Sequence, residues 1–242
     1  MKTLIISDIH ANITALDAVL NAAESFDSVW VLGDLVGYGP DPNECVDRIK
    51  TLPNVVCLMG NHDAATLGRL DIHSFNPAAQ ISVQWTQRKI TPENIAYLQG
   101  LPESVQLDDI TLAHGSPREP IWEYLLDTRN ATENFDYFQT PYCFVGHTHL
   151  PLSFSLHDGD TYATLDVMKA EVETFLVPRA IINPGSVGQP RDRDPRASYM
   201  LLDFDAKVVI NHRVSYDVQA VQDRMRKENL PVRHIERLSE GW

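Results

Sequence analysis

Short hydrophobic runs alternate with amphipathic segments along the first third of the chain. Three unbroken apolar runs predict buried strands, at residues 4–6, 29–32 and 55–59. The apolar stripe over residues 16–23 predicts a helix that Asn12 caps, and a second helix opens at Pro42 and ends near residue 52. Strands and helices that alternate in this way predict an α/β layer fold.

The remainder of the chain is first helical and then rich in strands. Residues 69–101 have a helical pattern, in which Pro77 and the Thr91–Pro92 pair each open a helix. Strands are then predicted at 110–113 and 142–145, with short helices between them at 119–126 and 132–138. Six further strands are predicted at 152–156, 162–165, 172–177, 180–182, 199–204 and 207–214. A last amphipathic helix is predicted at 217–229, ended by Pro231. Because no repeat, low-complexity tract or linker interrupts this order, we expect one domain over residues 1–242.

Every strand of the opening segment ends on a polar cluster, and two later strands do the same. The side chains concerned are Asp8, His10, Asp34, Asn61, His62, His114, His147 and His149. They include five of the nine histidines of the chain. Ligands of α/β sheets collect beyond the carboxyl ends of strands, so we expect these side chains to meet at one site. Alone, Asp8 or Asp34 is explained as well by a turn or a helix cap, but five such clusters in chain order are not.

The Gly146-His147-Thr148-His149 segment directly follows a predicted strand. Glycine adopts backbone angles that other residues avoid. We therefore expect a sharp bend after Gly146 that turns the imidazoles of His147 and His149 toward one point. Two histidines at a strand end suit a metal ion or a phosphate, although an isolated pair is as often structural.

The chemistry of these side chains predicts a metal centre. Carboxylate, amide oxygen and imidazole together suit borderline divalent metals, whereas calcium and magnesium prefer shells of oxygen. Seven ligands are too many for one ion and suit two ions that share a carboxylate. Two ions about 3.5–4 Å apart clamp the entering and leaving oxygens of an in-line displacement at phosphorus. We therefore expect two divalent ions, Mn ahead of Fe, Zn, Co or Ni, and a metal-bridging hydroxide that attacks phosphorus.

The ordered motifs resemble those of the calcineurin-like metallophosphoesterase superfamily, in particular its small bacterial branch. They are Asp-x-His, Gly-Asp, Gly-Asn-His-Asp, a lone His and Gly-His-Thr-His, between positions 8 and 149. The resemblance implies a four-layer α-β-β-α sandwich of two mixed sheets, with the metals on loops at one edge. It implies one metal held by Asp8, His10, Asp34 and His149, and another held by Asp34, Asn61, His114 and His147. His62 would then be the catalytic residue that protonates the leaving oxygen.

The sequence departs from the serine/threonine phosphoprotein phosphatases of that superfamily after Asp34. They carry a further Asp and an Arg there, whereas this chain has Leu35-Val36-Gly37-Tyr38. Their absence favours phosphodiester or nucleotide-like substrates. Basic candidates for substrate contact are Arg118 and Arg191, although each is explained as well by pairing with nearby acids. Tyr38 is a candidate for stacking on a base, or else a surface residue.

Charge and composition narrow the class of partners. The formal net charge of −13 does not suit a protein that binds extended nucleic acid. The three cysteines have no metal-type spacing and suit a reducing cytosol, and no run is long enough to span a bilayer. We therefore expect a cytoplasmic hydrolase of small phosphoester or nucleotide substrates, without a membrane partner. The pattern does not predict the oligomeric state.

Three function hypotheses remain at this point. The first is a metal-dependent phosphodiesterase. The second is a phosphomonoesterase that acts on phosphoproteins or on dinucleoside polyphosphates. The third is a catalytically silent scaffold of the same fold, but such scaffolds lack ligands and no ligand is missing here. The physiological substrate and the native metal are not fixed by the sequence.

Overall fold

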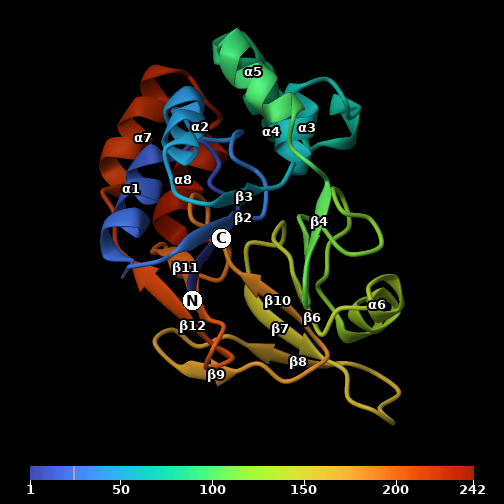
Figure 1. Cartoon of the computed structure of the whole chain (residues 1–242). Helices are drawn as coiled ribbons and strands as arrows, with labels where there is room; N and C mark the ends of the chain where they lie inside the picture. The colour runs from blue at the N-terminus through green and yellow to red at the C-terminus, as the bar shows by residue number, and fades with distance from the viewer. Residues whose placement is uncertain (24) are drawn as a thin grey trace.

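The computed structural model describes residues 1–23 and 25–242. Two six-stranded sheets pack face to face around an apolar core (Figure 1). The first sheet has the order β3 (Val55–Cys57), β2 (Ser28–Val31), β1 (Lys2–Ile6), β11 (Ala197–Asp203), β12 (Val208–Val214) and β9 (Glu173–Phe175). The second has the order β4 (Ser104–Leu107), β5 (Ile110–Ala113), β6 (Tyr142–Phe144), β10 (Ala180–Pro184), β7 (Pro151–Ser155) and β8 (Thr164–Val167).

Each sheet contains a run of three parallel strands, and its other pairs are antiparallel. In the first sheet β1, β2 and β3 run parallel, and in the second sheet β5, β6 and β10 do so. The register places Leu4 opposite Val29 on one side and opposite Leu201 on the other. Parallel strands bring their carboxyl ends to the same edge of a sheet, which is where α/β proteins bind their ligands.

Helices cover the outer face of each sheet. On the first sheet, Leu16 of α1 (Ile13–Ala22) and Val46 of α2 (Pro42–Lys50) pack in one cluster with Leu4. On the second, Ala131 of α6 (Thr128–Asn134) packs in a cluster with Cys143. The layers therefore run helix, sheet, sheet, helix, and the predicted four-layer α-β-β-α sandwich of two mixed sheets is confirmed.

Five further helices complete the fold. They are α3 (Asn61–Thr66), α4 (Pro77–Lys89), α5 (Pro92–Gln99), α7 (Val218–Lys227) and α8 (Val232–Glu240). Trp85 of α4 packs with Val221 of α7 and Ile235 of α8, so the C-terminal helices join the middle of the chain. In the described part of the chain no helix combines the length and apolarity needed to cross a membrane.

Most of the predicted elements are confirmed, and their signals are local ones. Asn12 caps α1 by accepting from the Ala15 amide at 3.0 Å, and Pro77 and Pro92 occupy the first turns of α4 and α5. The part of 69–101 before Pro77 contains only a short 3-10 turn, Ile72–Ser74. Three elements, α3, β4 and α8, were not predicted. Pro231 ends the helical segment before it, as predicted, but it also precedes the first turn of α8.

The predicted helix at 119–126 is wrong, because this segment forms turns. Pro120 disfavours helical angles at the residue before it. Glu123 accepts hydrogen bonds from Ser116 Oγ at 2.6 Å and from Asn134 Nδ2 at 2.9 Å, which fixes the segment by contacts outside itself. The next helix, α6, begins at Thr128 rather than at residue 132, because the Asp127 side chain caps the Asn130 amide at 2.8 Å.

Candidate metal centre

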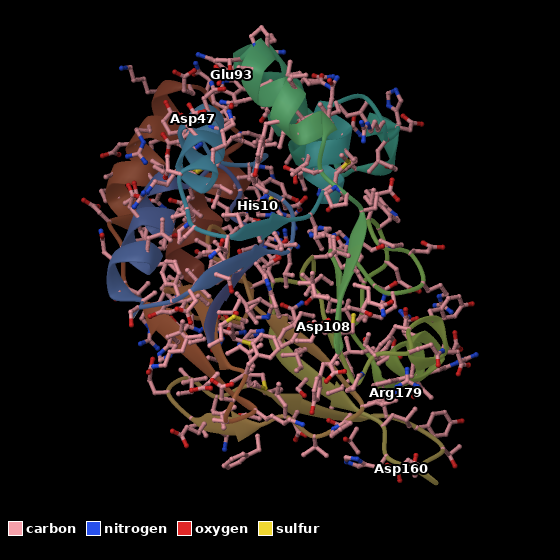
Figure 2. All side chains as sticks on the ribbon, in the orientation of Figure 1. His10, Asp47, Glu93, Asp108, Asp160 and Arg179 are labelled. Atoms are coloured by element: carbon pink, nitrogen blue, oxygen red, sulfur yellow. The ribbon has the colours of Figure 1, made fainter. Side chains whose placement is uncertain are left out.

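The predicted ligands converge from the carboxyl ends of β1, β2, β3, β5 and β6. They are Asp8, His10, Asp34, Asn61, His114, His147 and His149, and each is at most 3% exposed. His10, labelled in Figure 2, lies in the interior of the molecule. Ligand atoms from these side chains form three overlapping groups, each within 4.8 Å, and one of the groups also includes His62. Buried polar groups are rarely gathered in this way without a partner for their charge.

The first group joins the β1 loop to the segment after β6. His10 Nε2 lies 3.1 Å from His149 Nε2, and His149 Nε2 lies 3.3 Å from Asp8 Oδ1. His10 Nε2 lies 3.9 Å from the same Asp8 oxygen. Ligands around one ion with bonds near 2.0–2.2 Å stand about 3.0–3.5 Å from each other. The two shorter distances match that spacing.

The second group consists of Asp34, Asn61, His114 and His147, and the Asp34 carboxylate also lies next to the first group. His114 Nε2 lies 3.1 Å from Asn61 Oδ1 and 3.5 Å from Asp34 Oδ2. Asp34 Oδ2 also lies 3.6 Å from His10 Nε2, so one oxygen stands between the two groups. His147 completes the second group, with its ring 4.9 Å from that of His114. The arrangement matches two ion sites that share Asp34.

Backbone carbonyls fix which nitrogen each histidine turns toward the cluster. His10, His114 and His149 place Nδ1 at 3.2, 2.7 and 2.5 Å from the carbonyl oxygens of Val36, Leu32 and Gln189. A carbonyl oxygen only accepts, so each Nδ1 carries the proton and each Nε2 turns a lone pair inward. His147 is reversed, because its Nε2 lies 3.1 Å from the Trp122 carbonyl oxygen and its Nδ1 is left for the cluster.

The atoms that face inward fit a cation. Two Nε2 lone pairs, on His10 and His149, face each other at 3.1 Å, and Asp8 Oδ1 is buried without a hydrogen-bond partner. Burial lowers the pKa values of His10, His147 and His149 well below the usual range, which keeps these imidazoles neutral. Burial raises the pKa of Asp8 to about 7. Divalent ions supply the positive charge that this donor set lacks, so the residues present fit metal ions.

Residues 1–207 match the sequence profile of the calcineurin-like phosphoesterase superfamily domain. The chain belongs to this superfamily. It is therefore a phosphoester hydrolase of a divalent-metal-dependent family, as the resemblance of its motifs implies. The crystal structure of a metallophosphoesterase from Sphaerobacter thermophilus superposes with a TM-score of 0.92 at 45% identity, and covers 100% of this chain and 99% of that one.

Two comparisons with curated proteins complete this picture. The chain is 39% identical to the uncharacterized protein MJ0912 of Methanocaldococcus jannaschii over 98% of its own length and 97% of that protein. It is 34% identical over 87 residues to a symmetrical bis(5′-nucleosyl)-tetraphosphatase of Psychromonas ingrahamii. That match covers 34% of this chain and 32% of the tetraphosphatase, so this chain spans about a third of that relative.

Five of the predicted ligands have left-handed backbone angles. The φ values are 54° at Asp8, 48° at His10, 55° at Asp34, 66° at His147 and 62° at His149. Residues other than glycine adopt this region only when the surrounding structure enforces it, and such residues gather at functional sites. The backbone is therefore strained at these five predicted ligands.

The chain bends after Gly146 as predicted, but the predicted cause, an unusual backbone angle at the glycine, is wrong. Gly146 is not among the residues with positive φ, and His147 and His149 turn the chain themselves. Glycine is needed at 146 for space, because a Cβ there would overlap Ser7 Oγ and lie 3.1 Å from Asp8 Oδ2. This position lets the segment after β6 approach the β1 loop, and the His147 amide donates to Asp8 Oδ2 at 3.1 Å.

Asp63 joins two of the ligand loops. Its carboxylate accepts from the amides of Gly60, Leu35 and Val36 at 3.0, 3.3 and 3.1 Å. These contacts hold the loop after β3 against the loop after β2, next to Asp34. Asp63 is thus engaged with the backbone rather than with the ring of His62.

Alanine at Gly60 is expected to displace the Asp34 carboxylate and reduce bound metal. A Cβ at Gly60 would overlap Asp34 Oδ1 and lie 2.7 Å from Asp34 Cγ. Overpacking of this kind typically costs about 1–3 kcal/mol of stability. Gly100→Ala is the matched control, because the nearest atom to a Cβ there is 3.5 Å away. Elemental analysis and calorimetric unfolding of both variants test this, and equal metal content and equal Tm would contradict it.

His62 lies over the cluster without a hydrogen-bond partner at Nδ1. Its ring centre is 5.0 Å from that of His10 and 4.3 Å from that of Tyr38, and the residue is 3% exposed. Its amide donates to Asp34 Oδ1 at 2.8 Å, which fixes its backbone beside the shared carboxylate. Burial, and then the charge of Arg191, lower its pKa well below the usual range.

The three predicted substrate contacts lie in different surroundings. Arg118 makes ion pairs with Glu123 and, at 2.9 Å, with Glu133. Arg191 instead lies with its guanidinium 5.8 Å from the ring centre of Tyr38, near the cluster. Tyr38 is 7% exposed, not a surface residue, and its ring contacts those of His10, His62 and His234. Its burial leaves little of the ring for a base.

Sequence reasoning missed several residues beside the centre. Tyr124 stacks on His147 with ring centres 3.7 Å apart and remains 42% exposed. It lies in the segment that was predicted as a helix. His234 and Arg237 come from α8, and the ring of His234 is 4.5 Å from that of Tyr38. The available signal was a proline followed by apolar residues at helical spacing, since Ile235 and Leu238 are both buried.

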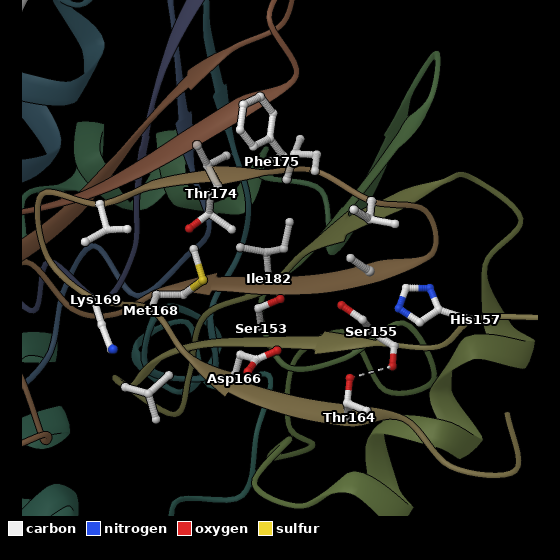
Figure 3. A pocket seen from close by; sticks show the side chains of 16 residues that line it. Ser153, Ser155, His157, Thr164, Asp166, Met168, Lys169, Thr174, Phe175 and Ile182 are labelled. Atoms are coloured by element: carbon white, nitrogen blue, oxygen red, sulfur yellow. Dashed lines mark hydrogen bonds between the residues drawn. The ribbon is translucent and has the colours of Figure 1, made fainter.

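A separate cavity of about 390 Å³ lies between β9 and the second sheet (Figure 3). Phe175 and Thr174 of β9 stand on one side of it, and Ile182, Ser153 and Asp166 on the other. None of the predicted site residues lines it. It is therefore distinct from the metal centre.

Proposed function

We propose that this metallophosphoesterase is a dinuclear enzyme that hydrolyses small phosphoester or nucleotide substrates. The observation that carries the proposal is the position of Asp34 Oδ2, 3.6 Å from His10 Nε2 and 3.5 Å from His114 Nε2. One ion would be held by Asp8, His10, Asp34 and His149, and the other by Asp34, Asn61, His114 and His147. When bound, such a pair of ions acts as a Lewis acid toward phosphoryl oxygens and lowers the pKa of water.

The protein side chains then bind and orient the phosphoryl group and move a proton. His62 is the proposed acid for the leaving oxygen, because its ring lies beside the shared carboxylate and its Nδ1 is not engaged elsewhere. An anionic substrate raises the pKa of a nearby imidazole, which opposes the effect of burial. Arg191 takes the place of the arginine that phosphoprotein phosphatases carry after the residue equivalent to Asp34. Its charge is available to the phosphoryl group, because Arg191 makes no ion pair among residues 1–23 and 25–242.

Phosphodiesters are the preferred substrate class, and Mn is the preferred metal ahead of Fe, Zn, Co and Ni. The absence of the Asp and Arg of phosphoprotein phosphatases supports the first preference, and the donor set supports the second. Dinucleoside polyphosphates are a second candidate, which the partial similarity to bis(5′-nucleosyl)-tetraphosphatases favours. Hydrolysis of bis(p-nitrophenyl) phosphate by Mn-loaded protein tests the proposal. Full activity after complete removal of metal would overturn it.

We further propose one cytoplasmic domain over residues 1–242. Strand β11, from the last quarter of the chain, pairs with the first strand β1, and residues from β11 and α1 share one core cluster. Cys45, Cys57 and Cys143 are free and buried, which suits a reducing compartment. The net charge of −13 argues against extended nucleic acid as a substrate.

Removal of metal is expected to lower the thermal stability of the protein. Without ions, the neutral imidazoles and the Asp8 carboxylate face one another without a counter-charge. An ion at a hundred times its Kd stabilises the folded state by about 2.7 kcal/mol, or about 5–10 °C in Tm for a chain of this size. Calorimetric unfolding with chelator, and again after Mn is restored, measures the shift. A Tm that does not change between the two conditions would contradict a metal centre built from these residues.

A further inference from the structure

Two arginines from separate segments meet beside the metal centre. Arg191 follows β10, and Arg237 lies on α8. Arg191 Nη2 and Arg237 Nη1 both donate to Gln189 Oε1, at 3.1 and 3.3 Å. The backbone carbonyl of Gln189 lies 2.5 Å from His149 Nδ1. Gln189 therefore ties the pair of arginines directly to a ligand of the centre.

This pair has unused hydrogen-bonding capacity and no counter-charge. The Nε atoms of Arg191 and Arg237 and the Nε2 atom of Gln189 are buried without a hydrogen-bond partner. Neither guanidinium forms an ion pair within the described ranges, 1–23 and 25–242. Two half-buried cations held together without an anion are unfavourable, which points to an anionic ligand.

Two other arginines of this region, Arg196 and Arg213, are paired with acids in the ordinary way. Arg196 makes an ion pair with Asp194 at 2.6 Å, and Arg213 makes one with Asp192. The two acids next to Arg191 in the sequence are thus engaged with other arginines. This leaves Arg191 free to face the centre.

Each guanidinium lies over an aromatic ring. Arg191 lies 5.8 Å from the ring centre of Tyr38, and Arg237 lies 5.6 Å from that of Trp242. A guanidinium supported on its face presents its N–H edge to a ligand, and that edge matches the oxygens of a phosphate. Burial and the charge of Arg191 lower the pKa of Arg237 to about 10, but it stays charged at neutral pH.

The two charges extend outward from the metal centre. Arg191 lies over the ring of Tyr38, and that ring is 4.5 Å from the ring of His10 and 4.3 Å from that of His62. Arg237 instead lies over the ring of Trp242, which is 49% exposed. The order is therefore the metal centre, Arg191 and then Arg237. A single phosphoryl group at the metals does not account for the outer cation.

We propose that Arg191 and Arg237 bind a second phosphoryl group, next to the one that is hydrolysed. The substrates are then compounds with at least two linked phosphoryl groups, whether inorganic or carried by nucleosides. This inference rests on the proposed function, because it places the attacked phosphoryl group at the metal centre. The reaction remains hydrolysis, with water added across the bond that breaks.

Arg237→Gln tests the outer position. The test substrates are diadenosine tetraphosphate and inorganic tripolyphosphate, and the reference substrate is bis(p-nitrophenyl) phosphate. In Arg237→Gln, kcat/KM for each test substrate, divided by kcat/KM for the reference, is expected to fall about 10-fold or more. This is the loss expected when a charge-assisted hydrogen bond is removed. Arg233→Gln is the matched control, because it removes the same charge from an exposed position of the same helix. An equal ratio in Arg237→Gln and Arg233→Gln would overturn the proposal. A loss with the nucleotide alone identifies nucleosides as the carrier, and a loss with both compounds identifies the phosphoryl chain itself.

Binding to metal-free protein separates this inference from the proposed function. In the presence of chelator, tripolyphosphate is expected to bind wild-type protein at least about 10-fold more tightly than Arg237→Gln in calorimetric titration. If wild-type protein binds tripolyphosphate more tightly than Arg237→Gln but hydrolyses no phosphoester, the proposed function is wrong and the anion site is still supported. Arg237→Lys keeps a cation and is expected to bind with intermediate affinity, which guards against a variant that fails to fold. Equal binding by wild type and both variants would overturn the anion site.

Discussion

Asp34→Asn is expected to release both metal ions and to lower kcat/KM by at least about 10³-fold. The substitution keeps the size of the side chain but removes the charge of the oxygen shared by the two ligand groups, 3.6 Å from His10 Nε2 and 3.5 Å from His114 Nε2. Metal ions stabilise developing charge on phosphoryl oxygens by several kcal/mol, and each 1.36 kcal/mol is tenfold in rate. Elemental analysis and steady-state kinetics with an aryl phosphodiester measure the two effects.

Asp8→Asn is the matched comparison for Asp34→Asn. Asp8 Oδ1 contacts only the group that contains His149, at 3.3 Å, and takes no part in the other. We therefore expect Asp8→Asn to bind one ion where Asp34→Asn binds none. Both variants exchange a buried carboxylate for an amide, so a general effect on folding would appear in each. Two bound ions in Asp34→Asn would rule out a shared carboxylate.

The sequence was sufficient for the strands and for the residues that end them. Asp8, Asp34 and His114 each follow an apolar run whose length and composition predict a buried strand, and the observed β1, β2 and β5 are these runs. Their convergence follows from topology, because parallel strands place their carboxyl ends at one edge of each sheet and the two sheets pack face to face. Information of this kind is local, and a single sequence contains it.

The backbone angles of the ligands could not be predicted in this way. His147 and His149 have φ of 66° and 62°, and propensity assigns such angles to glycine rather than to histidine. The reason lies outside the segment: Asp8 Oδ2 accepts the His147 amide at 3.1 Å, and the Gln189 carbonyl holds His149 at 2.5 Å. Contacts between residues about 40 and 139 positions apart determine the turn, and they exist only in the folded chain.

The second arginine of the centre was missed for a related reason. Pro231 was interpreted only as the end of a helix, although proline is also common at the first turn of the next one. With α8 absent from the prediction, Arg237 had no place near the ligands. Arg118, in contrast, is close to His114 in the sequence but turns toward Glu123 and Glu133. Proximity along the chain was a poor guide to which cations face the site.

His62→Ala is expected to lower kcat by about 10²–10⁴-fold while both metal ions remain bound, because it removes a proton donor and not a ligand. Its ring is held by packing between Tyr38 and Phe75, at centre distances of 4.3 and 5.2 Å, and its Nδ1 has no hydrogen-bond partner in the part of the chain that the structure describes. His73→Ala is the matched control, since His73 is exposed in the Ile72–Ser74 turn. Metal content and kcat are measured for both variants.

The leaving group separates proton donation by His62 from a structural role. A p-nitrophenolate departs readily without a proton, whereas an alkoxide needs one as the bond to phosphorus breaks. We therefore expect His62→Ala to impair hydrolysis of an alkyl ester more than hydrolysis of the aryl ester. An equal loss for both esters would assign His62 to positioning rather than to acid catalysis. Loss of an ion in His62→Ala would instead show that His62 is a metal ligand. The position of His62 permits this, because it belongs to one group of candidate ligands with His10 and Asp34.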